Sequence, residues 1–227
     1  MRSIHDGGCD RDLMVEDGPD IPLTRPLSNP IPCRKARKSW WLRQADKMPI
    51  VGMWSNRHVL ETPEEIERLQ ELLDRSAAGA GAHLSEIISA DRRLSAVQVC
   101  ERLHGMRLLV VATVTADGRP LVGPVDGYLL HGSFYFSSGR NSVRMRHLAA
   151  RPAVSATYLE GEELAVTVHG RAELFDVSDP TRSELRRAML DHYLPRQGPA
   201  FEIWLDQIDA VAARIDADKM FTYATSN

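Results

Sequence analysis

Hydrophobic residues follow a helical period in the part of this chain that begins near residue 62. Four apolar positions recur at steps of three and four residues, and they are Ile66, Leu69, Leu72 and Leu73. This spacing places them on one face of a helix. The preceding Thr62-Pro63-Glu64-Glu65 combines a threonine cap, a proline in the first turn and a glutamate three residues after the cap. The pattern predicts an amphipathic helix, and Ser95-Ala96-Val97-Gln98 repeats the capping signal for another helix that ends near Leu103.

From Leu108 onward the period changes to the alternation and β-branched content that are typical of strands. Turn residues, as in Asp117-Gly118-Arg119-Pro120 and His131-Gly132-Ser133, separate the runs. The predicted strands are 108–115, 121–125, 127–130, 134–137, 154–158 and 164–175, and a closing hairpin pairs 211–215 with 220–224 around Asp216-Ala217-Asp218-Lys219. Helices are predicted over 143–150, from Ser178 to about His192, and over 201–207. Short-looped strands with few helices predict an α+β fold with peripheral helices round a small, closed, mostly antiparallel sheet of six strands.

The first 57 residues show neither period and contain prolines at positions 19, 22, 26, 30, 32 and 49. We interpret 1–57 as a disordered leader, 58–105 as a helical N-terminal extension and 106–227 as the strand-rich domain. The basic segment 34–41 ends in two tryptophans. We interpret it as a solvated tail in preference to an arm for a phosphate backbone or a membrane surface. Translation that begins at Met48 or Met53 is an alternative for this segment.

Composition narrows the class of protein. The chain has 28 basic and 31 acidic residues and a formal charge of −3, so it lacks the cationic surface of a dedicated nucleic-acid binder, and no nucleic-acid partner is expected. The longest apolar run, Leu108 to Ala112, is far shorter than the roughly 20 residues that cross a bilayer. Met1 to Asp10 contains no apolar signal core. We therefore expect a cytoplasmic protein with no membrane partner.

The cysteines carry no signature of their own. Cys9, Cys33 and Cys100 are odd in number and form no CxxC pair, so they indicate neither a disulfide framework nor a thiolate metal cage. Cys100 and His104 stand four residues apart on a predicted helix, but no second pair accompanies them. Core packing is the better interpretation, and no metal is expected.

The most informative segment is the junction where the predicted strand 134–137 meets the helix 143–150. Ser142 is the expected cap of this helix, whose first backbone N–H groups are free to bind an anion. Ser138, Arg140 and Arg144 add a hydroxyl and two guanidinium groups. The junction predicts a phosphate-binding site, and the alternative is an ordinary capped surface helix with solvated arginines.

Several segments, in their order and spacing, resemble the split-barrel flavin and deazaflavin oxidoreductases, often described as pyridoxamine 5′-phosphate oxidase-like. The resemblance covers roughly residues 95 to 225. The segments that carry it are Ala112-Thr113-Val114, Asp117-Gly118-Arg119-Pro120, Pro124-Val125-Asp126-Gly127, Phe134-Tyr135-Phe136-Ser137-Ser138, Arg144-Met145-Arg146-His147-Leu148, Arg151-Pro152-Ala153-Val154-Ser155 and Val168-His169-Gly170-Arg171-Ala172. It implies a six-stranded split β-barrel and a cofactor-binding domain over 106–227.

The resemblance also implies a cofactor, FMN or coenzyme F-420, between the subunits of a homodimer. The cofactor phosphate would meet Ser138, Ser142 and Arg144. The isoalloxazine ring would lie against the backbone of Pro124, Val125 and Asp126, with Thr113 beside it. From the residues alone, Asp126 before Gly127 is more simply a turn residue than a group that steers a substrate cation or a ring nitrogen.

Two departures separate this chain from the true pyridoxamine 5′-phosphate oxidases. Those enzymes carry an arginine and a lysine for the FMN phosphate where this chain has Val122 and Gly127. They also end in a tryptophan and an arginine-histidine segment that hold the vitamin, whereas this chain ends in the segment 219–227 without either. Oxidation of vitamin B6 is therefore not expected.

Two function hypotheses follow. The first is a flavin- or deazaflavin-dependent oxidoreductase that transfers a hydride to or from a small organic substrate. The second is a non-catalytic carrier or sensor that binds the same cofactor. The sequence singles out no catalytic residue, and it leaves FMN and F-420 nearly balanced.

Overall fold

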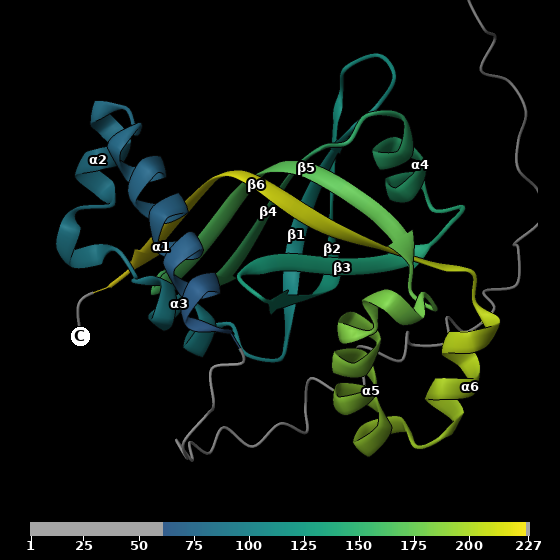
Figure 1. Cartoon of the computed structure of the whole chain (residues 1–227). Coiled ribbons are helices and arrows are strands. Elements are labelled where there is room, and N and C mark those ends of the chain that lie inside the picture. The colour runs from purple at the N-terminus through teal and green to yellow at the C-terminus, as the bar shows by residue number, and fades with distance from the viewer. Residues whose placement is uncertain (1–60, 226–227) are drawn as a thin grey trace, which may run out of the picture. The chain divides into compact units, whose positions relative to one another are not determined.

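A six-stranded barrel forms the centre of the computed structural model, which describes residues 61–225 (Figure 1). The proposed leader, 1–57, lies outside the described residues. The strands are β1 (Met106–Val114), β2 (Pro120–Leu130), β3 (Ser133–Gly139), β4 (Ala153–Glu160), β5 (Leu164–Asp176) and β6 (Ala210–Ala224). They close in the order β1-β2-β3-β6-β5-β4, and every pairing is antiparallel. The predicted α+β class and six-stranded split barrel are confirmed.

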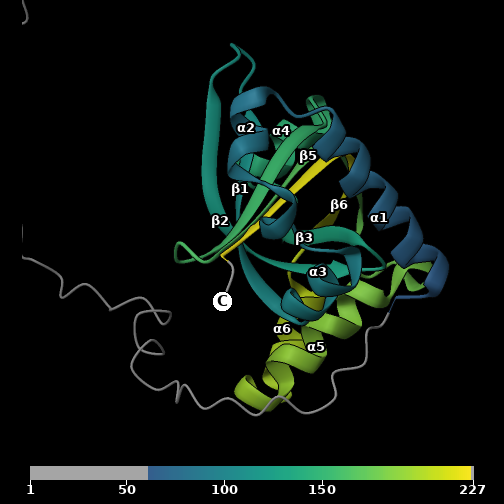
Figure 2. The same ribbon diagram turned by 90° about the vertical axis from the view of Figure 1, so that its left-hand side faces the viewer.

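Helices surround the barrel on three sides. The α-helices are α1 (Pro63–Ala78), α2 (Ala82–Ile87), α3 (Ala96–Arg102), α4 (Val143–Ala150), α5 (Glu184–Gln197) and α6 (Ala200–Gln207), and the 3-10 turns are η3 (Ala90–Arg92) and η4 (Pro180–Arg182). Helices α1 to α3 lie on one side of the barrel, α4 on the opposite side, and α5 and α6 beneath (Figures 1 and 2). None of the described helices is both long and apolar enough to cross a bilayer.

Local sequence explains where several helices begin. Thr62 accepts a hydrogen bond from the Glu65 amide while the Glu65 carboxylate accepts one from the Thr62 amide, so the predicted capping box is present. Ser95 and Gln98 form the same reciprocal pair at α3. The apolar stripe of α1 packs into the barrel core, where Leu69 and Leu73 join Phe134 and Phe136. The helical extension is therefore part of the same core as the barrel.

Two predicted turns lie inside continuous strands. The predicted strands 121–125 and 127–130 form a single strand, β2, that runs through Asp126 and Gly127. Gly127 serves close packing here, because a Cβ at this position would overlap the Leu109 side chain. Interpreting Asp126 as a turn residue is therefore wrong.

The predicted closing hairpin is also wrong, because 211–224 is one strand, β6. The turn-forming residues 216–219 lie at a β-bulge, where His169 pairs with Lys219 and the next residue, Gly170, pairs with Ala217. One extra residue in β6, Asp218, is thus inserted into the ladder. Because of the bulge, the segment 216–219 continues as part of β6 despite its turn-forming residues, and β6 closes the barrel.

We predict that Gly170→Ala destabilises the protein by about 1 to 3 kcal/mol, the usual cost of overpacking. A Cβ at Gly170 would overlap the backbone carbonyl oxygen of Asp216, which flexible side chains cannot relieve. The matched control is Gly139→Ala, where the new methyl group meets nothing within 4 Å. Chemical denaturation of the three proteins measures the difference, and equal stability of the two variants would contradict this role of the bulge.

Candidate functional site

A hollow opens where the end of β1, the start of β2 and the first turn of α4 meet. Its volume is about 230 Å³. The residues that line it are Thr113, Leu121, Val122, Gly123, Ser142, Val143 and Arg144. Three of the predicted site residues, Thr113, Ser142 and Arg144, are therefore brought together here although up to 31 positions separate them in the chain.

The first turn of α4 presents backbone donors at this hollow. Ser142 is the N-cap, and its Oγ accepts a hydrogen bond of 3.3 Å from the Met145 amide. The first intrahelical bond runs from the Arg146 amide to the Ser142 carbonyl. The amide groups of Val143 and Arg144 precede it and have no intrahelical acceptor. Their N–H groups and the positive end of the helix dipole favour an anion.

Arg144 adds a full positive charge beside these donors. Its Nη2 atom donates hydrogen bonds to the carbonyl oxygens of Gly123, at 3.0 Å, and Pro124, at 3.2 Å. Gly123 leaves room for the guanidinium beside β2, because a Cβ there would make a tight contact of 3.1 Å with Nη2.

The charge of Arg144 is only partly solvated. The side chain is half-buried, and burial lowers the pKa of its guanidinium. An arginine remains protonated at neutral pH even so. No acidic side chain of residues 61–225 forms an ion pair with it. Within the described part of the chain, Arg144 is thus a half-buried cation without an anion.

Thr113, which lines the hollow, takes part in a hydrogen bond that the sequence did not suggest. The buried Thr113 Oγ1 and the His147 Nδ1 of α4 lie 3.1 Å apart. His147 stands three residues after Arg144, so the two side chains are neighbours on the surface of the predicted helix. This spacing is the signal in the sequence that could have placed His147 near the site. The bond joins β1 to α4 and fixes the helix over the barrel end.

Arg140 lies apart from this group. It forms an ion pair with Asp209, at 2.8 Å, and another with Asp176. These two carboxylates raise the pKa of its guanidinium, the Asp209 bond first. Together with Asp206 and Arg186 the three residues border a separate hollow of about 380 Å³. Arg140 therefore ties the ends of β3, β5 and β6 together, and the structure does not bring it to Arg144.

Ser138 also remains outside the lining of the first hollow. It is half-buried on β3 and pairs with Val211 of β6. Of the four residues at the strand-to-helix junction that were expected to bind an anion, Ser142 and Arg144 line the hollow, whereas Ser138 and Arg140 do not.

The expected ring-binding segment follows the hollow along β2. Val125 packs against the barrel core, whereas Pro124 is exposed and Asp126 is half-buried. Pro124 stands opposite Val110, and Asp126 opposite Leu108. The Asp126 carboxylate accepts a hydrogen bond from the Tyr193 hydroxyl of α5, a contact between residues 67 positions apart.

The outer face of the barrel beside this segment is apolar and open. Leu108 is 56% exposed, Val110 39% and Val122 64%. In Figure 2 the β1–β2 hairpin forms one edge of the molecule, and none of the described helices covers the outer side of its upper part. Exposed apolar residues that adjoin one another on a sheet face indicate an interaction surface.

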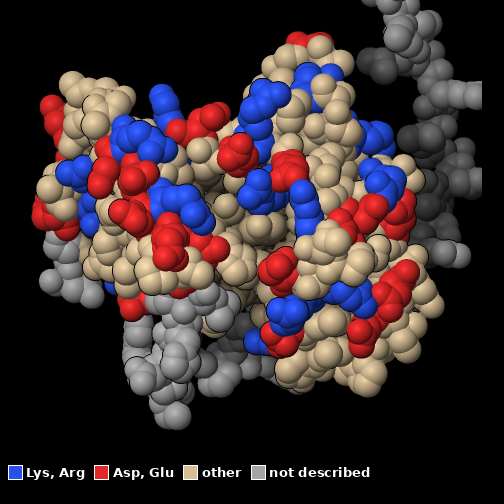
Figure 3. Space-filling view, in the orientation of Figure 1, with Lys and Arg blue, Asp and Glu red and all other residues tan. Residues whose placement is uncertain are grey.

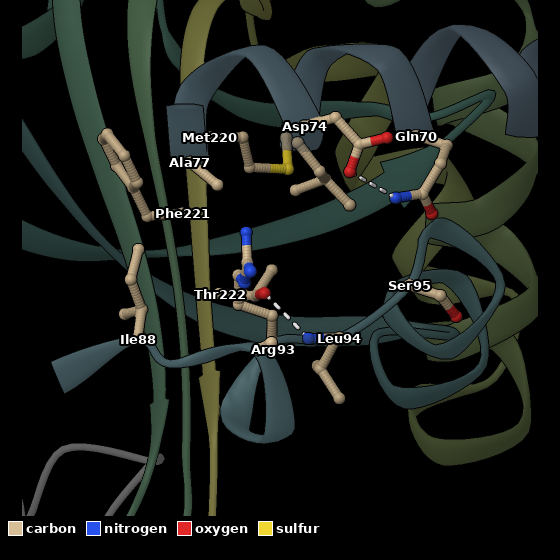
Figure 4. A pocket seen from close by; sticks show the side chains of 12 residues that line it. Gln70, Asp74, Ala77, Ile88, Arg93, Leu94, Ser95, Met220, Phe221 and Thr222 are labelled. Carbon is tan, nitrogen blue, oxygen red and sulfur yellow. Dashed lines mark hydrogen bonds between the residues drawn. The ribbon is translucent and has the colours of Figure 1, made fainter. Parts of the chain in front are cut away.

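Another hollow, of about 250 Å³, lies between α1, the segment around η3 and β6 (Figure 4). Arg93 points into it, Asp74 accepts a hydrogen bond from Gln70, and the Thr222 Oγ1 accepts one from the Leu94 amide. It contains none of the predicted site residues and lies on the side of the barrel opposite α4.

Charge and metal chemistry add no further site in the described residues. Basic and acidic side chains are interspersed on the face that Figure 3 shows, without a large field of one sign. No group of three or more His, Cys, Asp or Glu side chains within 61–225 is arranged to hold a metal ion. Burial raises the pKa of the Cys100 thiol to about 12, so this cysteine is a poor thiolate ligand or nucleophile at neutral pH.

Comparison with known proteins identifies the fold. The chain is similar to the conserved hypothetical protein Rv2991 from Mycobacterium tuberculosis, with 22% identity, a TM-score of 0.50, and coverage of 60% of this chain and 88% of that one. An F420 reductase matches at 23% identity and a TM-score of 0.41, over 52% of this chain and 91% of that chain. The heme storage protein HutZ from Vibrio cholerae matches at 20% identity and a TM-score of 0.44, over 52% and 86%.

A search of curated proteins finds no significant match. The sequence model of one family, described as pyridoxamine 5′-phosphate oxidase, matches residues 97–222, which is more than half of the chain. This range contains the whole barrel up to Thr222 of β6 and helices α4 to α6. The chain therefore belongs to the pyridoxamine 5′-phosphate oxidase-like split-barrel family.

Proposed function

We propose that this protein binds the phosphate of a flavin or deazaflavin coenzyme, FMN or F-420, in the hollow between β2 and α4. The observation that carries the proposal is Arg144, a half-buried cation with no acidic partner among residues 61–225. A phosphate would supply the missing anion and accept from the free N–H groups of the α4 N-terminus. Ser142 caps the same turn. The residues present therefore fit the phosphate end of such a coenzyme.

The ring system of the coenzyme would lie along β2 beyond Gly123. The backbone of Pro124, Val125 and Asp126 runs outward from the hollow, and Thr113 lines the hollow itself. Both coenzymes have a flat ring and an anionic tail, so this arrangement suits either of them. The family as a whole includes flavin users, which supports the proposal at that level.

The reaction we propose is hydride transfer to or from a small organic substrate. When bound, the coenzyme supplies the hydride chemistry at its N5 or C5 position. The chain's own residues bind and orient: Arg144 holds the phosphate, and the outer face of β2 positions the ring. Val122 and Gly127 stand where the true pyridoxamine 5′-phosphate oxidases carry an arginine and a lysine for the phosphate, and Val122 contributes only an apolar wall to the hollow. The phosphate would therefore depend on Arg144 and the first turn of α4.

We also propose that the protein is a cytoplasmic homodimer. Leu108, Val110 and Val122 expose an apolar surface beside the ring-binding segment. A second copy on this face would bury these side chains, exclude water from the ring and complete a site that one chain leaves open.

Replacement of Arg144 by Ala tests the phosphate site. We predict that it weakens binding of FMN or F-420, whichever binds, by about 1.5 to 3 kcal/mol, the scale of a charge-assisted hydrogen bond. Fluorescence titration under anaerobic conditions measures the affinity. Arg140→Ala is the matched control, because Arg140 lies in the other hollow with Asp209 and Asp176.

Arg140→Ala should therefore retain the affinity of the unmodified protein. An equal loss of coenzyme affinity in both variants, or an unchanged affinity in Arg144→Ala, would show that the phosphate does not bind at Arg144. If the absorbance of the bound coenzyme changes with no reductant or acceptor, the result would instead favour the second hypothesis, a non-catalytic carrier or sensor of the coenzyme.

A charge on the apolar face tests the dimer. We predict that the unmodified protein sediments as a dimer at micromolar concentration and that Leu108→Glu sediments as a monomer, because the carboxylate would be buried unpaired in the interface. Ile203→Glu is the control, since Ile203 is as exposed, at 58%, but lies on α6. Analytical ultracentrifugation decides, and a monomeric unmodified protein or a dimeric Leu108→Glu variant would refute the arrangement.

A further inference from the structure

Asp126 carries a carboxylate that forms no ion pair in the described residues. It lies half-buried on β2, and the Tyr193 hydroxyl donates a hydrogen bond to its Oδ2 atom. No Lys, Arg or His of the described residues forms an ion pair with it, and no donor of those residues reaches its Oδ1 atom. A partly buried carboxylate loses hydration, and that loss is offset only when donors replace the water. One of its two oxygens thus lacks a protein donor in this part of the chain.

Tyr193 holds this carboxylate in one place. Its ring stacks on Phe201 of α6, with centroids 4.5 Å apart and planes 28° apart. Met189 and Leu185, one and two turns earlier on α5, pack in the same cluster as Tyr128 of β2. Burial, followed by the bond to Asp126, raises the pKa of the Tyr193 hydroxyl. The phenol therefore stays protonated at neutral pH, where it can donate to Asp126.

Asp126 lies on the same strand as the two carbonyl groups that Arg144 contacts. Arg144 binds the carbonyls of Gly123 and Pro124, and Asp126 follows on the same strand. A strand rises about 3.3 Å per residue, so Gly123 and Asp126 lie roughly 10 Å apart. Pro124 and Asp126 project to the same outer face, opposite Val110 and Leu108. Arg144, which can bind an anion, and Asp126, which can accept a hydrogen bond, thus lie at the two ends of one apolar surface. This surface is about as long as a three-ring heterocycle.

We propose that Asp126 is a specificity-determining residue that accepts a hydrogen bond from the imide N–H of the coenzyme ring, and that Tyr193 is a positioning residue that orients its carboxylate. This inference rests on the proposed function. Both FMN and F-420 carry that N–H on a pyrimidinedione edge, so it does not depend on which of them binds. A carboxylate accepts but never donates when ionised, which matches an N–H and opposes a ring edge that offers only carbonyl oxygens.

The test compares each coenzyme with its N3-methylated analogue, in which a methyl group replaces the donor hydrogen. We expect the unmodified protein to bind the parent coenzyme about tenfold or more tightly than the methylated form, as a charge-assisted hydrogen bond implies. Asp126→Ala should bind the two forms with nearly equal affinity. Tyr193→Phe, which leaves the carboxylate but frees it to rotate, should show an intermediate ratio. Equilibrium dissociation constants from fluorescence titration provide these ratios without any assay of turnover.

Tyr128→Phe is the matched control. Tyr128 lies on the same face of β2 under the same helix, and its buried hydroxyl has no hydrogen-bond partner among the described residues. Its removal should leave the ratio of the unmodified protein unchanged. The comparison of parent and methylated coenzyme on the unmodified protein needs no variant, so it stands even if Asp126→Ala fails to fold.

The outcomes separate this inference from the proposed function. If the unmodified protein binds both forms of a coenzyme equally, Asp126 does not accept the imide N–H, while the phosphate site of Arg144 stands. A tenfold preference that persists in Asp126→Ala also overturns the inference, because another acceptor or the bulk of the methyl group then accounts for it. If neither FMN nor F-420 binds, the proposed function fails, and the role of Asp126 fails with it.

Discussion

The contact of the Arg144 guanidinium with the backbone of β2 is the interaction on which this account depends. It places a positive charge at the first turn of α4, where the free amides of the helix already favour an anion. Gly123 leaves room for this contact, since a Cβ there would lie only 3.1 Å from the Arg144 Nη2 atom. Arg144 forms no ion pair with an acidic side chain of the described residues, and we propose that the phosphate of a ligand supplies the missing negative charge.

The barrel supplies the rigidity that this site requires. Gly127 and Gly170 let neighbouring strands and side chains approach closely, and the bulge in β6 closes the sheet. The Thr113–His147 bond then fixes α4 over the barrel end, and Arg140 with Asp176 and Asp209 ties three strand ends together. These contacts hold Arg144 and Ser142 on one side of β2. Helix α5, through Tyr193, holds Asp126 farther along the same strand.

The sequence correctly predicted those features that depend on residues close together in the chain, such as the helix caps. The caps at Thr62, Ser95 and Ser142 depend on residues three positions apart, and all three are present in the structure. The turn signals at Asp126-Gly127 and at 216–219 misled because pairing with neighbouring strands overrode local turn propensity. Within the site, Arg140 looked equivalent to Arg144 from spacing alone. Its pairing with Asp209 and Asp176 depends on strand ends that come together only in the closed barrel, as does the bond between Tyr193 and Asp126.

A crystal structure of the protein grown with saturating FMN or F-420 tests the central claim most directly. We predict electron density for the coenzyme phosphate within hydrogen-bonding distance of the Arg144 guanidinium and the first amides of α4. A phosphate bound elsewhere on the molecule, or an Arg144 side chain that keeps no contact with a bound coenzyme, would contradict it.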